Sequence, residues 1–385
     1  MTTHDRPLYF DHNATTPVLP EVLDAMLPYL REHFGNPSSQ HAYGRASRDA
    51  IAKARVQVAS LLSCESSEIV WTSGGTEASN LALVGTCSQH STPGRVVITR
   101  IEHPATSRVC AELARRGWDV VSLPVTREGV VDLTLAHELI GPGTTLVSAM
   151  HSNNETGALQ PIEALGLRAR EVGATMHTDA AQSVGRVPLD MRTLPVDLLS
   201  IAGHKVYAPK GIGALYLRHG TRVEPVLRGA GHEGGVRPGT ENVASIVGLG
   251  MACEVAQRDM AHESKRQREL VEHLSARVLS ACPDASRTCA GVASLPNTLH
   301  LCFDRVLGDA LLAALPGLAA STGSACHEGH HEPSSVLTAM GLPRGLALGA
   351  VRLTLGRSTT RAEVEQAAAM LVAAYKRLAT METAP

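Results

Sequence analysis

The sequence of 385 residues predicts an α/β protein with a large domain on a mostly parallel sheet and a smaller α+β domain. Short apolar, β-branched runs alternate with helical stretches from about residue 68 to residue 217, as in strand–helix–strand units. A long charged helix follows, and further strand patterns come after it. Because a single core rarely grows past roughly 250–300 residues, we expect two domains. We place the large domain at residues 16–257 and the small one at residues 1–15 and 258–385.

Local patterns place the elements of both domains. Strands of the large domain are expected at residues 68–72, 95–99, 144–151, 174–178, 196–201 and 213–217, with helices at residues 76–84 and 162–172. A connecting helix is expected over residues 251–282, where Leu270, Val271, Leu274 and Val278 have helical spacing. In the small domain, strands are expected at residues 298–303 and 350–355. Residues 360–363 (Thr-Arg-Ala-Glu) are a capping box that begins a final helix.

Composition excludes several classes of protein. Apolar residues make up 44% of the chain and the formal net charge is −2, with no basic tract of the kind that binds nucleic acid. No apolar run reaches the ~18 residues of a membrane span, and the N-terminal residues contain no apolar signal core. The 8 cysteines lack paired CxxC spacing, which favours reduced thiols. We therefore expect a cytoplasmic globular protein that binds neither membranes nor nucleic acid directly.

Polar residues of different chemistry follow the predicted strands. Ligands of α/β sheets bind beyond the carboxyl ends of the strands, so these residues should converge. Residues 73–77 (Ser-Gly-Gly-Thr-Glu) form a glycine turn into a helix, whose free N–H groups can hold a phosphate; a plain turn is the alternative. His103 could stack on an aromatic ring and move protons. Asn154 offers an amide, in a segment that otherwise indicates a turn.

Two further strand ends make the prediction specific. A carboxylate such as Asp179 at a buried strand end needs a cation, and a protonated pyridine nitrogen is one, although a helix N-cap explains this position equally well. Lys205, one of five lysines, follows an apolar strand, where poor solvation favours the neutral amine that forms a Schiff base with an aldehyde. An ordinary surface lysine is the alternative. Together the strand ends outline a site for pyridoxal 5′-phosphate.

A segment at about residues 321–334 is rich in small and polar residues and indicates a surface loop that carries Cys326. A thiol there is accessible, whereas Cys302 lies in an apolar strand and is expected to be inert. Metal binding is the competing interpretation, because histidines and Glu332 crowd around Cys326. We expect no closed structural metal site, and a transient iron or cluster ligand at Cys326 stays open.

The motifs, in this order, resemble those of cysteine desulfurases of the NifS and IscS group, which are class V, fold-type I pyridoxal-phosphate enzymes. The resemblance runs from residues 9–16 (Tyr-Phe-Asp-His-Asn-Ala-Thr-Thr) to residues 356–358 (Gly-Arg-Ser), nearly the whole chain. It includes residues 34–39, 72–77, 177–182, 203–205, 237–240 and 324–326. It implies the fold-type I transferase fold. It also implies an enzyme that takes sulfur from L-cysteine and leaves L-alanine and a persulfide on Cys326.

The resemblance further implies roles for individual residues. Lys205 is the Schiff-base lysine and removes the substrate Cα proton, Cys326 is the nucleophile, and His103 moves protons over the ring. The implied cofactor contacts are Gly75, Thr76, His103, Asp179, Gln182, His204, Lys205 and Thr240, of which Thr240 reaches the neighbouring subunit of a homodimer. The implied substrate contacts are Asn36, Asn154 and Arg352. An arginine fork suits a carboxylate, and an exposed strand residue is the alternative for Arg352.

One position departs from the family pattern, and several questions stay open. Ala202 stands where a phosphate-binding serine is usual, so one hydroxyl contact should be missing. The sulfur-acceptor protein has no signal in the sequence: iron–sulfur cluster assembly, tRNA thiolation and DNA sulfur modification all use such enzymes. A related aminotransferase or lyase, such as a selenocysteine lyase, would need Lys205 but no loop thiol. A metal-binding scaffold protein would need the Cys/His segment but not Lys205.

Overall fold

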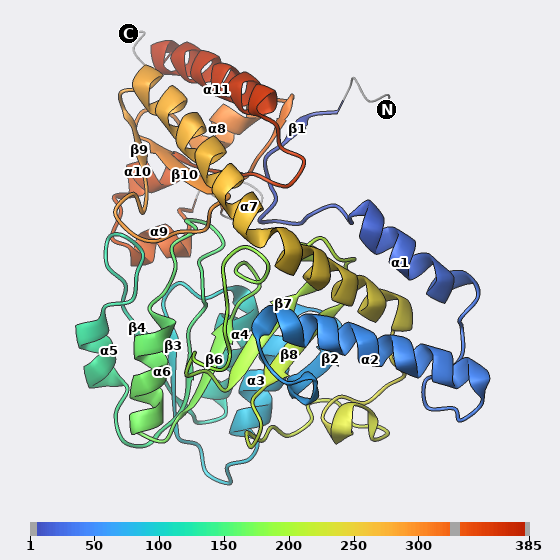
Figure 1. Ribbon diagram of the computed structural model, residues 1–385. Coiled ribbons are helices and arrows are strands. Elements are labelled where there is room, and N and C mark those ends of the chain that lie inside the picture. Colours follow the sequence, from blue (N-terminus) through green and yellow to red (C-terminus); the bar gives the residue numbers. More distant parts are fainter. Residues whose placement is uncertain (1–5, 324–331, 382–385) are drawn as a thin grey trace.

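The computed structural model describes residues 6–323 and 332–381 and is centred on a seven-stranded sheet (Figure 1). Its strands are β2 (Ile69–Thr72), β3 (Arg95–Thr99), β4 (Asp119–Leu123), β5 (Thr144–Ser148), β6 (Thr175–Asp179), β7 (Leu198–Ala202) and β8 (Gly213–Leu217). They lie in the order β2-β8-β7-β6-β5-β3-β4, and each neighbouring pair is parallel except the two pairs that β8 makes. The predicted mostly parallel sheet is therefore confirmed.

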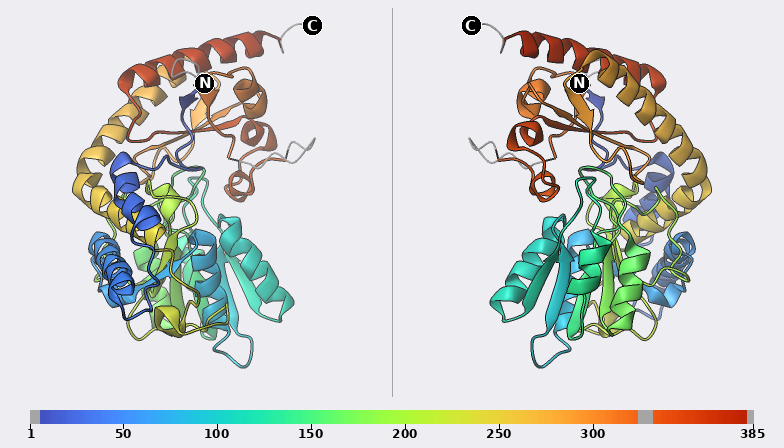
Figure 2. Two further views of the ribbon diagram at one scale, coloured as in Figure 1. Left: turned by 90° about the vertical axis from the view of Figure 1, so that its right-hand side faces the viewer. Right: turned by 90° about the vertical axis from the view of Figure 1, so that its left-hand side faces the viewer.

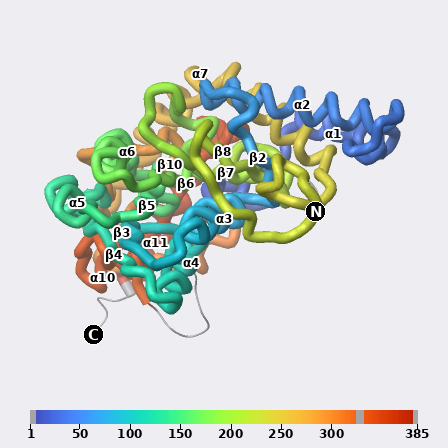
Figure 3. Tube along the Cα trace, turned by 90° about the horizontal axis from the view of Figure 1, so that it is seen from below, coloured from blue at the N-terminus to red at the C-terminus, as the bar shows by residue number. Residues whose placement is uncertain are grey.

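Helices cover both faces of this sheet, because successive side chains of a strand point to opposite sides. On β2, Ile69 and Trp71 enter one core and Val70 enters the other. The first core includes side chains of α2 (Ala42–Leu62), α5 (Leu133–Leu139), α6 (Ile162–Glu171) and α7 (Val243–Ala281); the second includes those of α3 (Gly75–Cys87) and α4 (Pro104–Arg115). Figure 3 shows α2 and α7 on one side of the strands and α3 and α4 on the other.

The edge strand β4 is missing from the sequence prediction. It pairs with β3 at the end of the sheet, and most of its side chains are partly or fully exposed. An edge strand with so little buried surface has no clear apolar run, which explains why its pattern was not recognised. The other strands of the sheet differ from prediction by up to three residues at their ends. One such difference places Asp179 inside β6 as its last residue.

A second, smaller sheet lies above the first in Figure 1. It consists of β9 (Ala285–Arg287), β10 (Thr298–Phe303) and β12 (Ala350–Thr354) in the antiparallel order β12-β10-β9. Beside it, β1 (Leu8–Tyr9) pairs in parallel with β11 (Leu318–Ala319). The remaining helices of this part are α8 (Gly308–Ala313), α9 (Ser335–Ala339), α10 (Arg344–Leu348) and α11 (Arg361–Met381). The N-terminal segment thus packs with the C-terminal third of the chain.

The helix α7 joins the two parts and begins eight residues before its predicted start. Its first half places Leu249 and Cys253 in the core of the large sheet, and its second half places Leu274 and Val278 in the core of the small one. Both views of Figure 2 show it running along the side of the molecule from one part to the other. The predicted domain division after residue 257 falls within this helix and stays a prediction.

The final helix has the predicted capping box. The Thr360 backbone N–H donates to Glu363 Oε2 at 2.7 Å, and the Glu363 N–H donates to Thr360 Oγ1 at 3.2 Å. The chain also contains α1 (Pro20–Arg31) and the 3₁₀ turns η1 (Ser66–Glu68), η2 (Gly203–Lys205) and η3 (His232–Gly235). None of the helices in the two described ranges combines the length and apolarity needed to cross a bilayer.

Candidate active site

A cavity of about 300 Å³ lies at the carboxyl ends of the strands, between the two parts of the molecule. Most of the predicted site residues line it: Gly75, Thr76, His103, Asn154, Asp179, Gln182, His204, Lys205 and Arg352. The strands explain this convergence. Asp179 ends β6, Lys205 lies in the 3₁₀ turn after β7, and His103 caps the helix that follows β3. Because these strands run in parallel, their last residues meet at one edge of the sheet.

Lys205 points its amine at the N-terminal segment of the chain. Its Nζ donates to the carbonyl oxygens of Asn13 at 2.5 Å and Ala14 at 2.7 Å. Burial lowers the pKa of the Lys205 amine to about 8, and the positive charges of Arg186 and Arg352 contribute to this shift. Roughly a tenth of the amine is therefore neutral at pH 7, far more than for an ordinary lysine, and this neutral form is the one that a nucleophile or base requires.

The buried cation Arg186 lies directly behind this lysine and was not singled out from the sequence. Its guanidinium donates to Asn13 Oδ1 at 3.0 Å, to Gln182 Oε1 at 2.6 Å and to the backbone oxygens of His12, Gln182 and Lys205. All of these partners are neutral, so the charge acts on the cavity without local compensation. The sequence neighbours of Arg186, Gln182 to Val187, form no apolar run, so the sequence carries no clear signal for a buried arginine here.

Asp179 and His103 both line the cavity, and the charge of each affects the pKa of the other. Burial raises the pKa of the Asp179 carboxyl, while a hydrogen bond from the Ala181 N–H at 2.9 Å and the charges of His103 and Lys205 oppose that shift. Burial lowers the pKa of His103, whose Nδ1 accepts the Ala105 N–H at 3.1 Å. The neutral His103 ring therefore carries its proton on Nε2. A cationic ring nitrogen next to Asp179 would remove the cost of burying this carboxylate.

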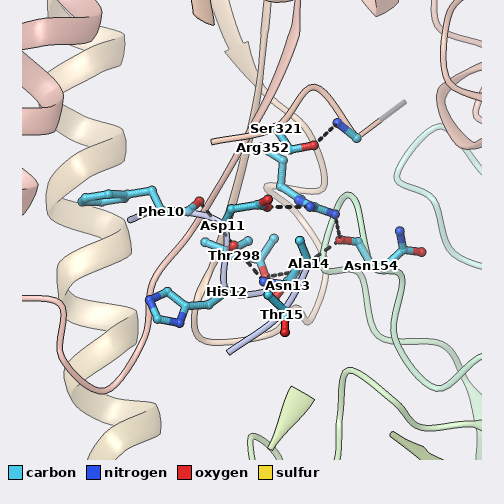
Figure 4. Close-up of polar contacts among 12 residues, drawn as sticks. Phe10, Asp11, His12, Asn13, Ala14, Thr15, Asn154, Thr298, Ser321 and Arg352 are labelled. Carbon is cyan, nitrogen blue, oxygen red and sulfur yellow. Dashed lines mark hydrogen bonds and ion pairs between the residues drawn. The ribbon is translucent and has the colours of Figure 1, made fainter. Parts of the chain in front are cut away.

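Arg352 lies on β12 of the small sheet, and its side chain lies beside Asp11 and the turn at Asn154 (Figure 4). One terminal nitrogen donates to the Asn154 backbone oxygen at 2.8 Å, and the other donates to Asp11 Oδ1 at 2.7 Å. The side chain is buried, its Nε has no hydrogen-bond partner among the described residues, and each terminal nitrogen keeps a second N–H. These groups can bind a small carboxylate, and the alternative of an exposed strand residue is excluded.

Asn13 connects these groups, although its own role was not predicted. Its Nδ2 donates to the Asn154 backbone oxygen at 3.2 Å and to Thr298 Oγ1 at 3.0 Å (Figure 4). The Asn13 backbone oxygen accepts from Gln182 Nε2 at 2.9 Å as well as from Lys205. The N-terminal segment thus forms one wall of the cavity and determines where the lysine amine lies.

The residues expected to hold a phosphate lie at the start of α3 and after β7. Thr76 is in the first turn of α3, where backbone N–H groups are free to bind an anion. A Cβ on Gly75 would lie only 3.1 Å from the Ala202 Cβ, so the helix begins directly against the end of β7. His204 Nδ1 lies 3.1 Å from Thr15 Oγ1, and burial lowers the pKa of this ring to about 4.

Two predicted residues, Asn36 and Thr240, are not brought to this cavity. Asn36 and Thr240 line a separate cavity of about 840 Å³, together with Arg55 and Glu233. Cys326 and its histidine neighbours lie outside the described residues. Within the described ranges, no group of three or more His, Cys, Asp and Glu side chains could hold a metal ion. Cys302 is buried, and burial raises the pKa of its thiol to about 12, as expected for an inert cysteine.

Comparison with known proteins gives the family. The model of the aminotransferase class-V family matches residues 8–367. Cysteine desulfurase 2 of Trichormus variabilis is 44% identical over 373 residues, which cover 96% of this chain and 94% of that protein. A solved NifS-like protein superposes with a TM-score of 0.90 at 34% identity, covering 97% of this chain and 100% of its own. The structure titled "SspA in complex with cysteine" has a TM-score of 0.81 at 35% identity, covering 90% and 98%.

The chain therefore belongs to the class-V aminotransferase family and, within it, to the cysteine desulfurases. The predicted fold class, the predicted enzyme class and the predicted resemblance to NifS are thereby confirmed.

Proposed function

We propose that this chain binds pyridoxal 5′-phosphate through Lys205 and transfers the sulfur of L-cysteine to Cys326, releasing L-alanine. The observation that carries the proposal is the partly neutral Lys205 amine in one cavity with the buried Asp179 carboxylate and the free N–H groups at the start of α3. These three groups fit an aldehyde, a protonated ring nitrogen and a phosphate respectively.

Several residues would hold this cofactor. Lys205 would bind its aldehyde carbon, Asp179 its ring nitrogen, and Thr76 and His204 its phosphate, with His103 over the ring and Gln182 near the ring hydroxyl. The Gln182 amide already donates to Asn13 and accepts from Arg186, and one amide N–H remains for the cofactor. When bound, the cofactor withdraws electrons from the substrate Cα and so acidifies its proton.

The residues of the chain would then carry out the proton transfers. The neutral Lys205 amine takes the Cα proton, because its lowered pKa leaves it a free electron pair near neutral pH. Nε2 of His103 exchanges a proton with the substrate thiol. Arg352 orients the substrate through its carboxylate, while Asp11 and Asn154 hold the guanidinium in place.

Sulfur transfer would follow as a displacement at the substrate sulfur. The Cys326 thiolate attacks this atom, a sulfur–sulfur bond forms and the carbon–sulfur bond breaks. The electron pair of the broken bond stays with the substrate carbon, which gains a proton and becomes the methyl group of alanine. The enzyme-bound persulfide then passes its sulfur to an acceptor protein, whose identity and pathway stay open.

We further propose that the enzyme is a cytoplasmic homodimer. The free thiols of the described cysteines suit a reducing compartment. Thr240 lies away from the first cavity of its own chain, which is consistent with a contact to the cofactor phosphate of a neighbouring subunit. Sedimentation of the purified protein tests the dimer, and a monomer at micromolar concentration would contradict it.

The proposed roles of Lys205 and Cys326 can be tested separately. Borohydride reduction of the cofactor-loaded enzyme should trap the adduct on Lys205 and leave Lys210, the control, unmodified. Cys326→Ala should still bind the cofactor and cysteine but form no protein persulfide, whereas Cys64→Ala should behave as wild type. An adduct on another residue would overturn the cofactor assignment. Persulfide formation in Cys326→Ala would overturn the assignment of the nucleophile.

A further inference from the structure

Glu155 is a buried carboxylic acid to which the proposed reaction gives no role. It follows Asn154 in the turn after β5, and only 7% of the residue is exposed. Its backbone N–H donates to Asn153 Oδ1 at 2.9 Å, so the turn itself is held by side-chain hydrogen bonds. A buried carboxyl group in such a position is costly unless it makes a specific contact.

The carboxyl group of Glu155 contacts the chain on both sides of residues 324–331. On the C-terminal side, Ser334 Oγ donates to Glu155 Oε2 at 2.5 Å. The same hydroxyl accepts the N–H groups of Val336 and Leu337 at the start of α9, so its single proton is available for Glu155. On the N-terminal side, a Cβ on Gly323 would lie 2.9 Å from Oε2 and 3.2 Å from Cδ of Glu155. Gly323 therefore packs directly against the carboxyl group.

The turn that contains Glu155 also binds Arg352, because the Asn154 backbone oxygen accepts from the Arg352 guanidinium; we call this pair the Asn154–Arg352 unit. The backbone N–H of Arg352 donates to the backbone oxygen of Ser321 at 2.6 Å. Burial raises the pKa of Glu155 to about 7, while the hydrogen bond from Ser334 and the charge of Arg352 oppose the shift. Arg352 is also paired with the carboxylate of Asp11. Glu155 thus lies between the proposed substrate-carboxylate site and both ends of the segment that carries Cys326.

We infer that Glu155 is a positioning residue that fixes Gly323 and Ser334, and with them the two ends of the Cys326 segment, against the Asn154–Arg352 unit. This inference rests on the proposed function of Cys326 and adds how its segment is held relative to the substrate. Because nucleophilic attack requires close alignment of thiol and substrate sulfur, loss of this anchor should slow sulfur transfer and leave substrate binding nearly unchanged.

The test compares Glu155→Ala with the isosteric Glu155→Gln in the cofactor-loaded enzyme. Glu155→Ala should lower kcat for alanine formation by about tenfold and change KM for cysteine by less than about twofold, because alignment and not binding is affected. Glu155→Gln keeps an acceptor oxygen for Ser334 and should stay within about twofold of wild type. The control is Glu138→Ala, at an exposed position.

A second readout does not depend on activity. Cleavage by a glutamate-specific protease after Glu328 should be several-fold faster in Glu155→Ala than in Glu155→Gln, because unanchored ends let the segment reach a protease more often. Ser334→Gly removes the same hydrogen bond and keeps a residue that helix N-caps tolerate, so it should reproduce both effects if Glu155→Ala fails to fold.

The outcomes separate the inference from the proposed function. If Cys326→Ala abolishes persulfide formation but Glu155→Ala leaves kcat and cleavage unchanged, the positioning role is wrong and the proposed function stands. A rise in KM with unchanged kcat also contradicts the positioning role, since it would assign Glu155 to substrate binding. Equal losses in Glu155→Gln and Glu155→Ala would show that the charge is needed and not the hydrogen bond, which overturns the inference.

Discussion

At the scale of single residues, the cavity depends on two buried cations, Lys205 and Arg186, whose hydrogen bonds go to neutral oxygens. Lys205 donates to two backbone oxygens, and Arg186 behind it donates to neutral oxygens as well. Burial disfavours the ammonium form, and the adjacent guanidinium disfavours it further. The surroundings of Lys205 thus raise the neutral fraction of its amine before any substrate binds.

The Arg186→Met variant should make the Lys205 amine harder to deprotonate. In the cofactor-free protein, competitive labelling with an amine reagent and mass spectrometry should give half-maximal labelling of Lys205 near pH 8. Because Arg186 lowers the pKa of Lys205, its removal should move this midpoint to higher pH, while Arg186→Lys should leave it near the wild-type value. Exposed Lys53 serves as the internal reference. An unchanged midpoint in Arg186→Met would show that Arg186 does not lower the pKa of Lys205 and would contradict this prediction.

At the scale of elements, α7 holds the two parts together through close helix packing. A Cβ on Gly250 of α7 would lie 2.6 Å from Ala54 Cα and 2.7 Å from Ala54 Cβ of α2. The absence of a side chain at this position lets the two helices approach each other closely. The second half of α7 packs in the core of the small sheet, so its orientation depends on this contact.

Gly250→Leu should destabilise the protein even though leucine is the better helix former. Helix propensity would contribute up to about 1 kcal/mol in favour, but overpacking a tight contact between backbones costs typically ~1–3 kcal/mol or more. We therefore expect a lower free energy of unfolding in urea denaturation followed by circular dichroism. Ala261→Leu, at an exposed position of the same helix, should stay within about 0.5 kcal/mol of wild type. A more stable Gly250→Leu would show that α2 and α7 can separate without cost.

At the scale of the whole molecule, buried histidines dominate the response to acid. Burial lowers the pKa of five rings to about 3 or 4, namely His12, His151, His177, His204 and His300. Two buried acids have the opposite shift, because burial raises the pKa of Glu102 to about 8 and of Glu155 to about 7. As pH falls from about 6.5 to 4.5, the five rings bind protons in the unfolded chain but stay mostly neutral in the folded chain. The folded chain holds the two carboxyl protons, which the unfolded chain largely lacks in this window, and this opposes the effect of the histidines. Five histidines outweigh two carboxyl groups.

The free energy of unfolding should therefore decrease as the pH is lowered from about 6.5 to 4.5. Each histidine contributes a slope of up to about 1.4 kcal/mol per pH unit, because its protonation is confined to the unfolded state. His300→Leu should reduce the slope by about one such unit, whereas His90→Leu at an exposed position should leave it unchanged. Urea unfolding at pH 7, 6 and 5 measures the slope. A stability that stays constant or rises toward pH 5 would contradict the dominance of the histidines.

Much of the site followed from local sequence patterns. Each of Thr76, His103, Asn154, Asp179 and Lys205 comes at or just after a strand with a recognisable apolar run, so the parallel topology alone brings them together. Cys302 was likewise predicted to be inert from its apolar surroundings. The edge strand β4 was missed, because a partly exposed strand has no comparable pattern.

The sequence by itself determined the family and the groups that its site brings together: a lysine, a carboxylate and a glycine turn at the ends of strands of a mostly parallel sheet. Tertiary structure alone decided how these groups are tuned. Asn13 and Arg186 contact each other across 173 positions, and Glu155 and Ser334 across 179. The physical reason is that strand and turn patterns depend on neighbours in the chain. The cost of burying a charge depends on which distant groups the packing places beside it.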